Sequence, residues 1–191
     1  MNAKTTKQIE EMMNQTIGVE VEMNNITRTK AAQIAAEFFG TGRHEHTTGR
    51  NGYDTYSAWD NEGREWKFQK DVSIHGPDSE KCELVTPILT YADMETLQEL
   101  IRRLRRAGAK SDSTRGCGVH IHIGAKGHTP QTLRNLANIM ASHESLLAEA
   151  LNLDHYRMSR YCRTVDPRFL EQINRRKPTT MADLADIWYG S

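Results

Sequence analysis

Residues 17–23 of this 191-residue chain read IGVEVEM, and residues 118–123 read GVHIHI. In both stretches, apolar side chains alternate strictly with polar or small ones. That period of two is typical of a β-strand with one buried face and one open face. The two stretches therefore predict two strands of the same design, each with one apolar face.

Acidic and imidazole side chains occupy the open faces of these two strands. Glu20 and Glu22 share one face of the first strand, and His120 and His122 share one face of the second. Same-face neighbours on a strand lie about 6.6 Å apart, and two carboxylates so close need positive charge between them. Either pair alone also fits an ordinary solvent-exposed strand. Together they predict one shared patch that holds metal ions.

The remaining segments predict further strands and helices. Tight-turn residues 60–63 join two strands at 53–59 and 64–70, and another strand covers 81–86. Helices are expected at 29–39, with Thr29 as its cap, and at 92–107, about 130–151 and 181–189. Residues 40–52, which contain His44 and His46, are expected to form a surface loop. This order predicts a single α+β domain over residues 1–191, with a mostly antiparallel sheet and helices packed on one face.

Other residues with metal-binding chemistry give weaker signals. Glu83 lies in an expected strand, and Asp71 follows another, where an Asx turn explains it equally well. Cys117 lies near the two histidines, but the spacing does not match a zinc finger or ribbon. A mixed set of carboxylates and histidines favours Mg²⁺ or Mn²⁺, since hard cations prefer oxygen ligands.

Composition excludes several classes of function. The chain has 25 basic and 25 acidic residues, and such a balance argues against nucleic-acid binding that rests on phosphate neutralisation. No apolar run approaches the roughly 18 residues of a membrane span. Three cysteines without paired spacing and an N-terminus without a signal-like apolar region predict a cytoplasmic protein.

Four segments in order resemble the amidoligase family. They are GVEVE at 18–22, WKFQKDVSI at 66–74, ELVTPIL at 83–89 and GVHIHI at 118–123. Members of this family are carboxylate–amine ligases related to glutamine synthetase and glutamate–cysteine ligase. The resemblance implies a cup-shaped, curved antiparallel sheet that binds ATP and Mg²⁺ or Mn²⁺. It also implies that ATP phosphorylates a carboxylate, and that an amine then attacks the acyl phosphate.

The resemblance also implies roles for individual residues. The expected metal ligands are Glu20, Glu22, Glu83 and His120. The expected catalytic residues are Asp71, Glu83 and His122. The expected nucleotide contacts are His120, His122, Lys67 and Arg160, with Arg28 as a further candidate cation. The substrates would be a carboxylate and an amine, on small molecules or on peptides.

One expected element has no counterpart in this sequence. Family members usually carry a later strand with a Glu-Phe-Arg-like segment, whereas this sequence ends at Trp188-Tyr189-Gly190-Ser191. We expect such a chain to be a weak ligase alone, and to associate with another copy or with a missing C-terminal segment. Two alternatives stay open: a nucleotide- or metal-binding module without turnover, and a metal-dependent hydrolase.

Overall fold

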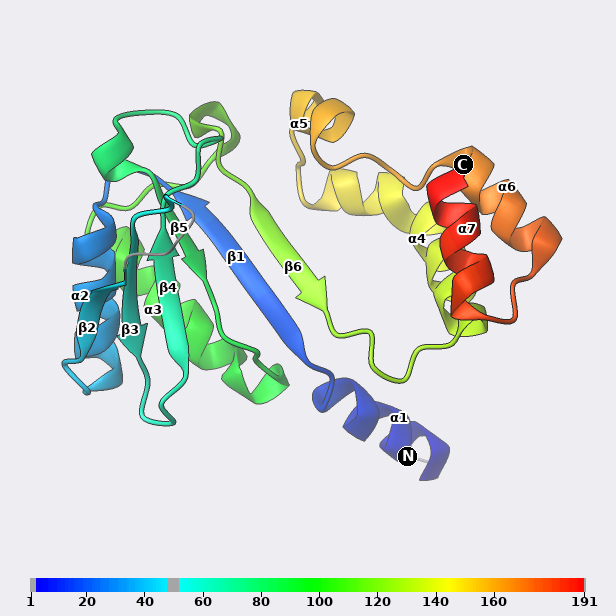
Figure 1. Ribbon diagram of the computed structural model, residues 1–191, viewed down its shortest axis with the longest axis horizontal. Coiled ribbons are helices and arrows are strands. Elements are labelled where there is room, and N and C mark those ends of the chain that lie inside the picture. The colour runs from blue at the N-terminus through cyan, green and yellow to red at the C-terminus, as the bar shows by residue number, and fades with distance from the viewer. Residues whose placement is uncertain (1–2, 48–51, 191) are drawn as a thin grey trace. The chain divides into compact units, whose positions relative to one another are not determined.

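The computed structural model describes residues 3–47 and 52–190. The chain forms two compact units, Met1–Gly124 and Ala125–Ser191, which are described separately (Figure 1). The first unit contains a six-stranded sheet and three α-helices. The strands are β1 (Ile17–Met23), β2 (His44–Thr47), β3 (Thr55–Trp59), β4 (Glu65–Gln69), β5 (Cys82–Val85) and β6 (Val119–Ile123). The helices are α1 (Ala3–Met13), α2 (Arg28–Phe39) and α3 (Met94–Arg106).

Every pair of neighbouring strands in this sheet is antiparallel. The strand order is β2-β3-β4-β5-β1-β6. Strands β1 and β6 are therefore direct neighbours, with Glu20 opposite His120 and Val19 opposite Ile121. On its other side β1 pairs with β5, where Glu22 lies opposite Glu83. The predicted α+β class and antiparallel sheet are confirmed.

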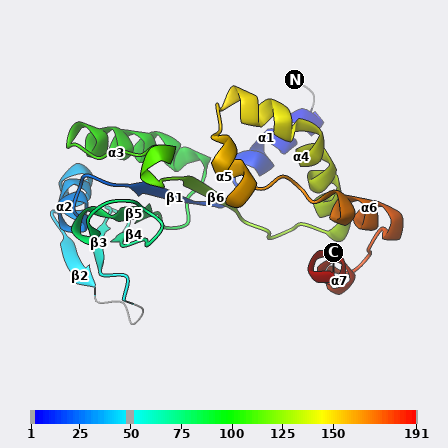
Figure 2. The same ribbon diagram turned by 90° about the horizontal axis from the view of Figure 1, so that it is seen from above.

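The apolar face of the sheet forms the core of the first unit. Val19, Trp66, Phe68 and Leu84 alternate inward from three neighbouring strands and are buried. Helices α2 and α3 contribute to the same apolar cluster, and Figure 2 shows the sheet from above with both helices. The helices thus take up one face, and the alternating polar residues are left on the other.

Helix α2 packs closely because its inner face is made of alanines. Ala31, Ala32, Ala35 and Ala36 are at most 1% exposed, and such small side chains let the helix backbone approach the sheet. The N-cap is Thr27, which accepts a hydrogen bond from the backbone N–H of Lys30. The sequence predicted Thr29 in that role, but the cap lies two residues earlier, at Thr27, and the helix begins at Arg28.

Two elements of the first unit, one strand and one α-helix, were not predicted from the sequence. The expected loop at 40–52 contains β2, which pairs with β3, while residues 48–51 lie outside the described part. His46 stacks on Tyr56 and its Nε2 lies 2.8 Å from Oδ1 of Asp54. The sequence HEHT has no apolar residue to mark a strand, so pairing with β3 determines its structure. Helix α1 was also missed.

The second unit is helical. Its helices are α4 (Pro130–Ala150), α5 (His155–Arg160), α6 (Pro167–Arg176) and α7 (Met181–Gly190). Phe169 and Ile173 of α6 form a small buried cluster with Leu184 and Ile187 of α7. The prediction of one domain over residues 1–191 stays a prediction. Among the described helices of both units, none has the length and apolar character needed to cross a membrane.

A buried carboxylate anchors the β3–β4 hairpin. Oδ1 of Asp60 accepts the backbone N–H groups of Glu62 and Arg64 at 3.0 and 2.9 Å. Oδ2 accepts the Arg64 Nε–H and the Trp66 indole N–H at 2.8 and 3.0 Å. Burial alone would raise the pKa of Asp60, but the hydrogen bonds from Trp66 and Arg64 outweigh it and hold the pKa below its ordinary value. The charged carboxylate therefore stabilises the fold.

We expect Asp60→Asn to lower the free energy of unfolding at pH 7 by about 1–3 kcal/mol, because an amide nitrogen cannot accept hydrogen bonds from Arg64 and Trp66. Because the pKa of Asp60 is lowered, its charged form stabilises the folded protein above about pH 4. This stabilisation is lost as the pH falls through the pKa of Asp60 in the folded state. Urea unfolding at several pH values, with the exposed Glu62→Gln as control, measures this. A difference between wild type and Asp60→Asn that does not narrow below about pH 4 would contradict the assignment.

A candidate metal centre on the open face of the sheet

The open face of the sheet brings together acidic and imidazole side chains from three strands. Glu20 and Glu22 lie on β1, Glu83 on β5, and His120 on β6. The registers place Glu22 opposite Glu83 and Glu20 opposite His120. The alternation read from the sequence therefore produces the expected shared patch, although the role of each residue in it stays a prediction.

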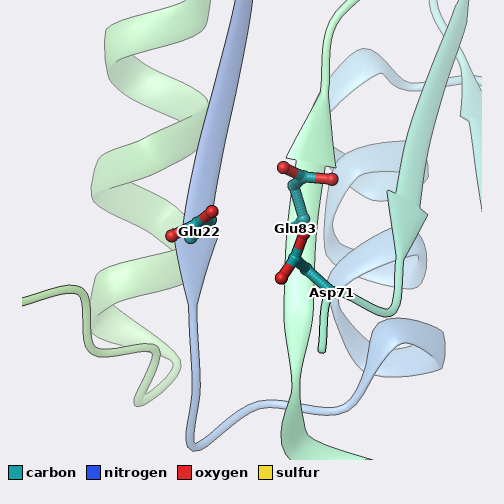
Figure 3. A group of neighbouring side chains, drawn as sticks. All are labelled: Glu22, Asp71 and Glu83. Atoms are coloured by element: carbon teal, nitrogen blue, oxygen red, sulfur yellow. The ribbon is translucent and has the colours of Figure 1, made fainter. Parts of the chain in front are cut away.

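Three carboxylates form the tightest group in this patch. Glu22, Glu83 and Asp71 each offer one oxygen, and these oxygens all lie within 4.8 Å of one another. Figure 3 shows Glu22 on β1, Glu83 on β5 and Asp71 on the segment that follows β4. Glu22 and Glu83 are only 4% and 6% exposed. Negative charge so concentrated and so buried is costly without a cation.

Neighbouring donors fix the three carboxylates. Gln69, paired with Glu83 in the β4–β5 register, donates its amide Nε2–H to Oε2 of Glu83 at 2.8 Å. The backbone N–H of Gly118 donates to Oε2 of Glu22 at 2.6 Å. The backbone N–H of Ser73 donates to Oδ1 of Asp71 at 2.6 Å. The Asx turn anticipated at Asp71 is thus present, and the same carboxylate also faces the cluster.

The two histidines border this carboxylate group on the β6 side. Nε2 of His120 lies 3.5 Å from Oε1 of Glu22, and its Nδ1 lies 4.0 Å from Oε2 of Glu20. Nε2 of His122 lies 3.3 Å from the same Glu20 oxygen. Both imidazoles are at least half exposed, so they meet the carboxylates from the solvent side. Glu20, His120 and His122 form a second, more open group beside the buried one.

The electrostatics of Glu83 agree with a cation site. Burial raises the pKa of Glu83, and the hydrogen bond from Gln69 opposes that rise. The nearby charges of Glu20, Asp71 and Glu22 raise the pKa further. A divalent cation would offset the repulsion from Glu20, Asp71 and Glu22, because it would place positive charge between the carboxylates.

The chemistry of the donors fits Mg²⁺ or Mn²⁺. Three carboxylate oxygens are hard ligands, and the group has no thiolate, since Cys117 is buried and its Sγ–H contacts the carbonyl of Arg115. Mg²⁺ is commonly held by one or two carboxylates together with substrate phosphates and water. Glu22, Asp71 and Glu83 could therefore hold one cation, and Glu20 with His120 could hold another.

Two basic side chains were expected from the sequence to contact nucleotide, and they lie on different elements. Lys67 lies on the open face of β4, half exposed, with its Nζ 3.7 Å from Glu65. Arg160 belongs to the second unit, on α5, and donates to the hydroxyl of Tyr156 at 3.4 Å. Contact of either residue with nucleotide stays a prediction.

Arg28 is a buried structural residue. Its Nη1 donates to the carbonyl oxygens of Asp78 and Lys81, both at 2.7 Å, and its Nε–H and Nη2–H donate to the backbone and carboxylate of Asp54. Only 8% of the side chain is exposed. The guanidinium thus ties the β2–β3 segment to the start of β5, and the suggestion that it contacts a substrate anion is not supported.

Three residues at the site were missed from the sequence. They are Gln69 with its side-chain amide, Ser73 with its backbone N–H and its hydroxyl, which lies 3.5 Å from Oε1 of Glu22, and Gly118 with its backbone N–H. Gln69 carried a usable signal, because it shares its strand face with Lys67 two residues away. The two backbone N–H donors gave no signal in the sequence, since the position of an N–H group depends on strand pairing and turn geometry.

The comparisons with known proteins give one match. A family model described as "Putative amidoligase enzyme" matches residues 13–191, and so covers most of the chain and all the residues of the patch. No curated protein and no solved structure matches the chain.

We expect Glu83→Gln to weaken Mn²⁺ binding at least tenfold, because it removes one of three clustered charges. It should also raise the thermal midpoint of the metal-free protein, since the remaining carboxylates repel each other less. Calorimetric titration with Mn²⁺ and thermal unfolding measure the two effects. Glu45→Gln, an exposed carboxylate on β2 that pairs with Arg43, is the control and should change neither. Equal Mn²⁺ affinity in Glu83→Gln and wild type would contradict the site.

Proposed function

This chain belongs to the amidoligase family, and from that premise we propose that it is an ATP-dependent carboxylate–amine ligase. Membership confirms the resemblance seen in the four sequence segments and supports a ligase activity in general. The dependence on ATP, the acyl-phosphate route and the binding of Mg²⁺-ATP on the open sheet face are our proposal.

The observation that carries the proposal is the buried group of Glu22, Asp71 and Glu83. An acyl-phosphate ligase must bring the polyphosphate of ATP next to a substrate carboxylate, and both are anions. Three carboxylates within 4.8 Å on an open sheet face repel such ligands unless divalent cations lie between them. A cation held by Glu22, Asp71 and Glu83 would supply that charge neutralisation and would withdraw electrons from the phosphate oxygens.

The reaction has two steps. In the first, an oxygen of the substrate carboxylate attacks the γ-phosphorus of ATP, and the bond between that phosphorus and the ADP oxygen breaks. In the second, the amine nitrogen attacks the acyl carbon and loses a proton, and inorganic phosphate leaves. Since the protein makes no covalent bond to the substrate, its contribution is positioning and electrostatic stabilisation.

The exposed ammonium and imidazole groups of the open face suit the phosphates, and the carboxylate of Asp71 suits the amine. His120 and His122 present their imidazoles beside Glu20, about half exposed, where a phosphate oxygen can accept their N–H groups. The half-exposed ammonium of Lys67 adds a positive charge on the same face. Asp71 is less buried than Glu83 and Glu22, and so is the carboxylate best placed to meet the incoming amine as well as a cation.

A trapping assay tests the activity without knowledge of the natural amine. Purified protein, Mg²⁺, ATP and hydroxylamine are mixed with glutamate, aspartate or blocked peptides that contain them. We expect hydroxamate and ADP in equal amounts, since hydroxylamine intercepts an acyl phosphate. Asp71→Asn should lower the rate at least tenfold, and Glu45→Gln should match wild type. ATP binding without ADP release would instead indicate a non-catalytic module, and cleavage of substrate without ATP would indicate a hydrolase.

A further inference from the structure

The segment that follows β4 brings a hydroxyl group to the buried carboxylates. The backbone N–H of Ser73 donates to Oδ1 of Asp71 at 2.6 Å, which closes the Asx turn. The same turn brings the Ser73 hydroxyl oxygen to 3.5 Å from Oε1 of Glu22 on β1. Ser73 therefore meets two of the three carboxylates, one through its backbone and the other through its side chain.

Neighbouring residues hold the backbone of Ser73 in place. Ile74 is 1% exposed, and the backbone N–H of His75 donates to the carbonyl oxygen of Arg115 at 2.8 Å. Gly116 lies so close that a Cβ atom at its position would stand 2.5 Å from the Ser73 carbonyl oxygen. Such an approach admits only glycine. Packing within the first unit thus fixes the segment that carries the hydroxyl.

The distance between the Ser73 hydroxyl and Glu22 is long for a hydrogen bond. O–H···O hydrogen bonds in proteins are about 2.5–3.0 Å long, whereas these two oxygens are 3.5 Å apart. Around an octahedral cation with oxygens at roughly 2.0–2.1 Å, neighbouring oxygens lie about 3 Å apart and opposite oxygens about 4 Å apart. The observed separation falls between these two values, and so it fits two ligands of one ion.

The two oxygens of Glu22 have different surroundings. Oε2 accepts the backbone N–H of Gly118 at 2.6 Å. Oε1 has the Ser73 hydroxyl oxygen and Nε2 of His120 near it, each at 3.5 Å. Two further potential ligand atoms therefore lie close to Oε1, and one of them is the oxygen of Ser73.

We propose that the Ser73 hydroxyl is a fourth protein ligand of the cation held by Glu22, Asp71 and Glu83, and that it favours hard cations there. The proposal rests on the proposed function, which includes that cation. Serine and threonine hydroxyls bind Mg²⁺ in P-loop NTPases, so the chemistry of the ligand is suitable. The hydroxyl adds a hard oxygen and no further negative charge.

A neutral ligand suits a site that must also accept phosphate. Three ionised carboxylates and one divalent cation leave a net charge of −1, and a fourth carboxylate would make it −2 and repel phosphate more strongly. Three carboxylate oxygens and one hydroxyl also leave two positions of an octahedral cation for phosphate oxygens or water. A serine at position 73 therefore adds affinity for the cation without closing the site to nucleotide.

Ser73→Cys tests the proposal by replacing a hard oxygen with a soft sulfur. Cd²⁺ binds thiolates strongly, whereas Mn²⁺ prefers oxygen ligands. We expect Ser73→Cys to raise the ratio of Cd²⁺ affinity to Mn²⁺ affinity at least tenfold, and to give the ultraviolet absorption of a cadmium–sulfur bond. A Cys162→Ser background is used throughout, because Cys162 is exposed while Cys82 and Cys117 are buried.

Ser111→Cys is the matched control, since it places a thiol on the other side of β1. Ser111 is exposed and borders a cavity with Val21 and Met23. These two side chains alternate with Glu22 and so lie on the opposite face of the strand. The ratio of Cd²⁺ affinity to Mn²⁺ affinity in Ser111→Cys should equal that of the background protein.

Two further variants separate the hydroxyl from the turn, and they keep the proposal testable if the cysteine variant does not fold. Ser73→Ala keeps the N–H that donates to Asp71 and loses only the hydroxyl, so we expect Mn²⁺ binding to weaken at least fivefold. Ser73→Thr keeps both groups and should stay within threefold of wild type. An unchanged affinity ratio in a folded Ser73→Cys would overturn the proposal, as would Mn²⁺ affinity in Ser73→Ala within twofold of wild type.

These outcomes are separable from a failure of the proposed function, because metal binding is measured without ATP and without turnover. If Ser73→Cys gains Cd²⁺ affinity as expected while no carboxylate yields hydroxamate, the ligase is refuted and the Ser73 ligand stands. If wild type forms hydroxamate while the affinity ratio of Ser73→Cys is unchanged, the Ser73 ligand is refuted and the ligase stands.

Discussion

Glu22 and Glu83 face each other from neighbouring strands, buried almost completely, with an oxygen of Asp71 within 4.8 Å of both. Three carboxylates cannot stay ionised so close together without compensation. The protein supplies part of it through donors from Gln69, Ser73 and Gly118. These donors stabilise the negative charge but do not neutralise it, which is the reason that we propose a cation at this site. The arrangement of the open face depends on this constraint.

The same backbone that places the carboxylates also builds the core. Along β1, Val19 and Met23 enter the apolar cluster while the intervening Glu20 and Glu22 reach the open face. Any slip of one residue in the β1–β5 register would bury charge and expose aliphatic side chains. Core packing under α2 and α3 therefore fixes the register, and the register fixes which acidic groups meet. Core packing thus determines both the stability of the sheet and the geometry of the site.

The sequence was most informative where a side chain's position follows from strand period alone. Glu20, Glu22, His120 and His122 could be assigned to one patch because alternation fixes their face. The strand β2 could not be predicted, since HEHT owes its structure to pairing with β3 and to contacts such as that of His46 with Asp54. Arg28 was only a candidate cation from the sequence, which does not show that four hydrogen-bonded groups surround its guanidinium.

The position of the bound cation tests the central claim most directly. Crystals grown with Mn²⁺ and a non-hydrolysable ATP analogue would show the metal by its anomalous scattering. We expect a peak bonded to carboxylate oxygens of Glu22, Asp71 and Glu83, at the roughly 2.0–2.1 Å typical of small hard cations such as Mg²⁺. A fully occupied Mn²⁺ elsewhere on the molecule, with these three carboxylates bonded only to protein donors and water, would contradict it.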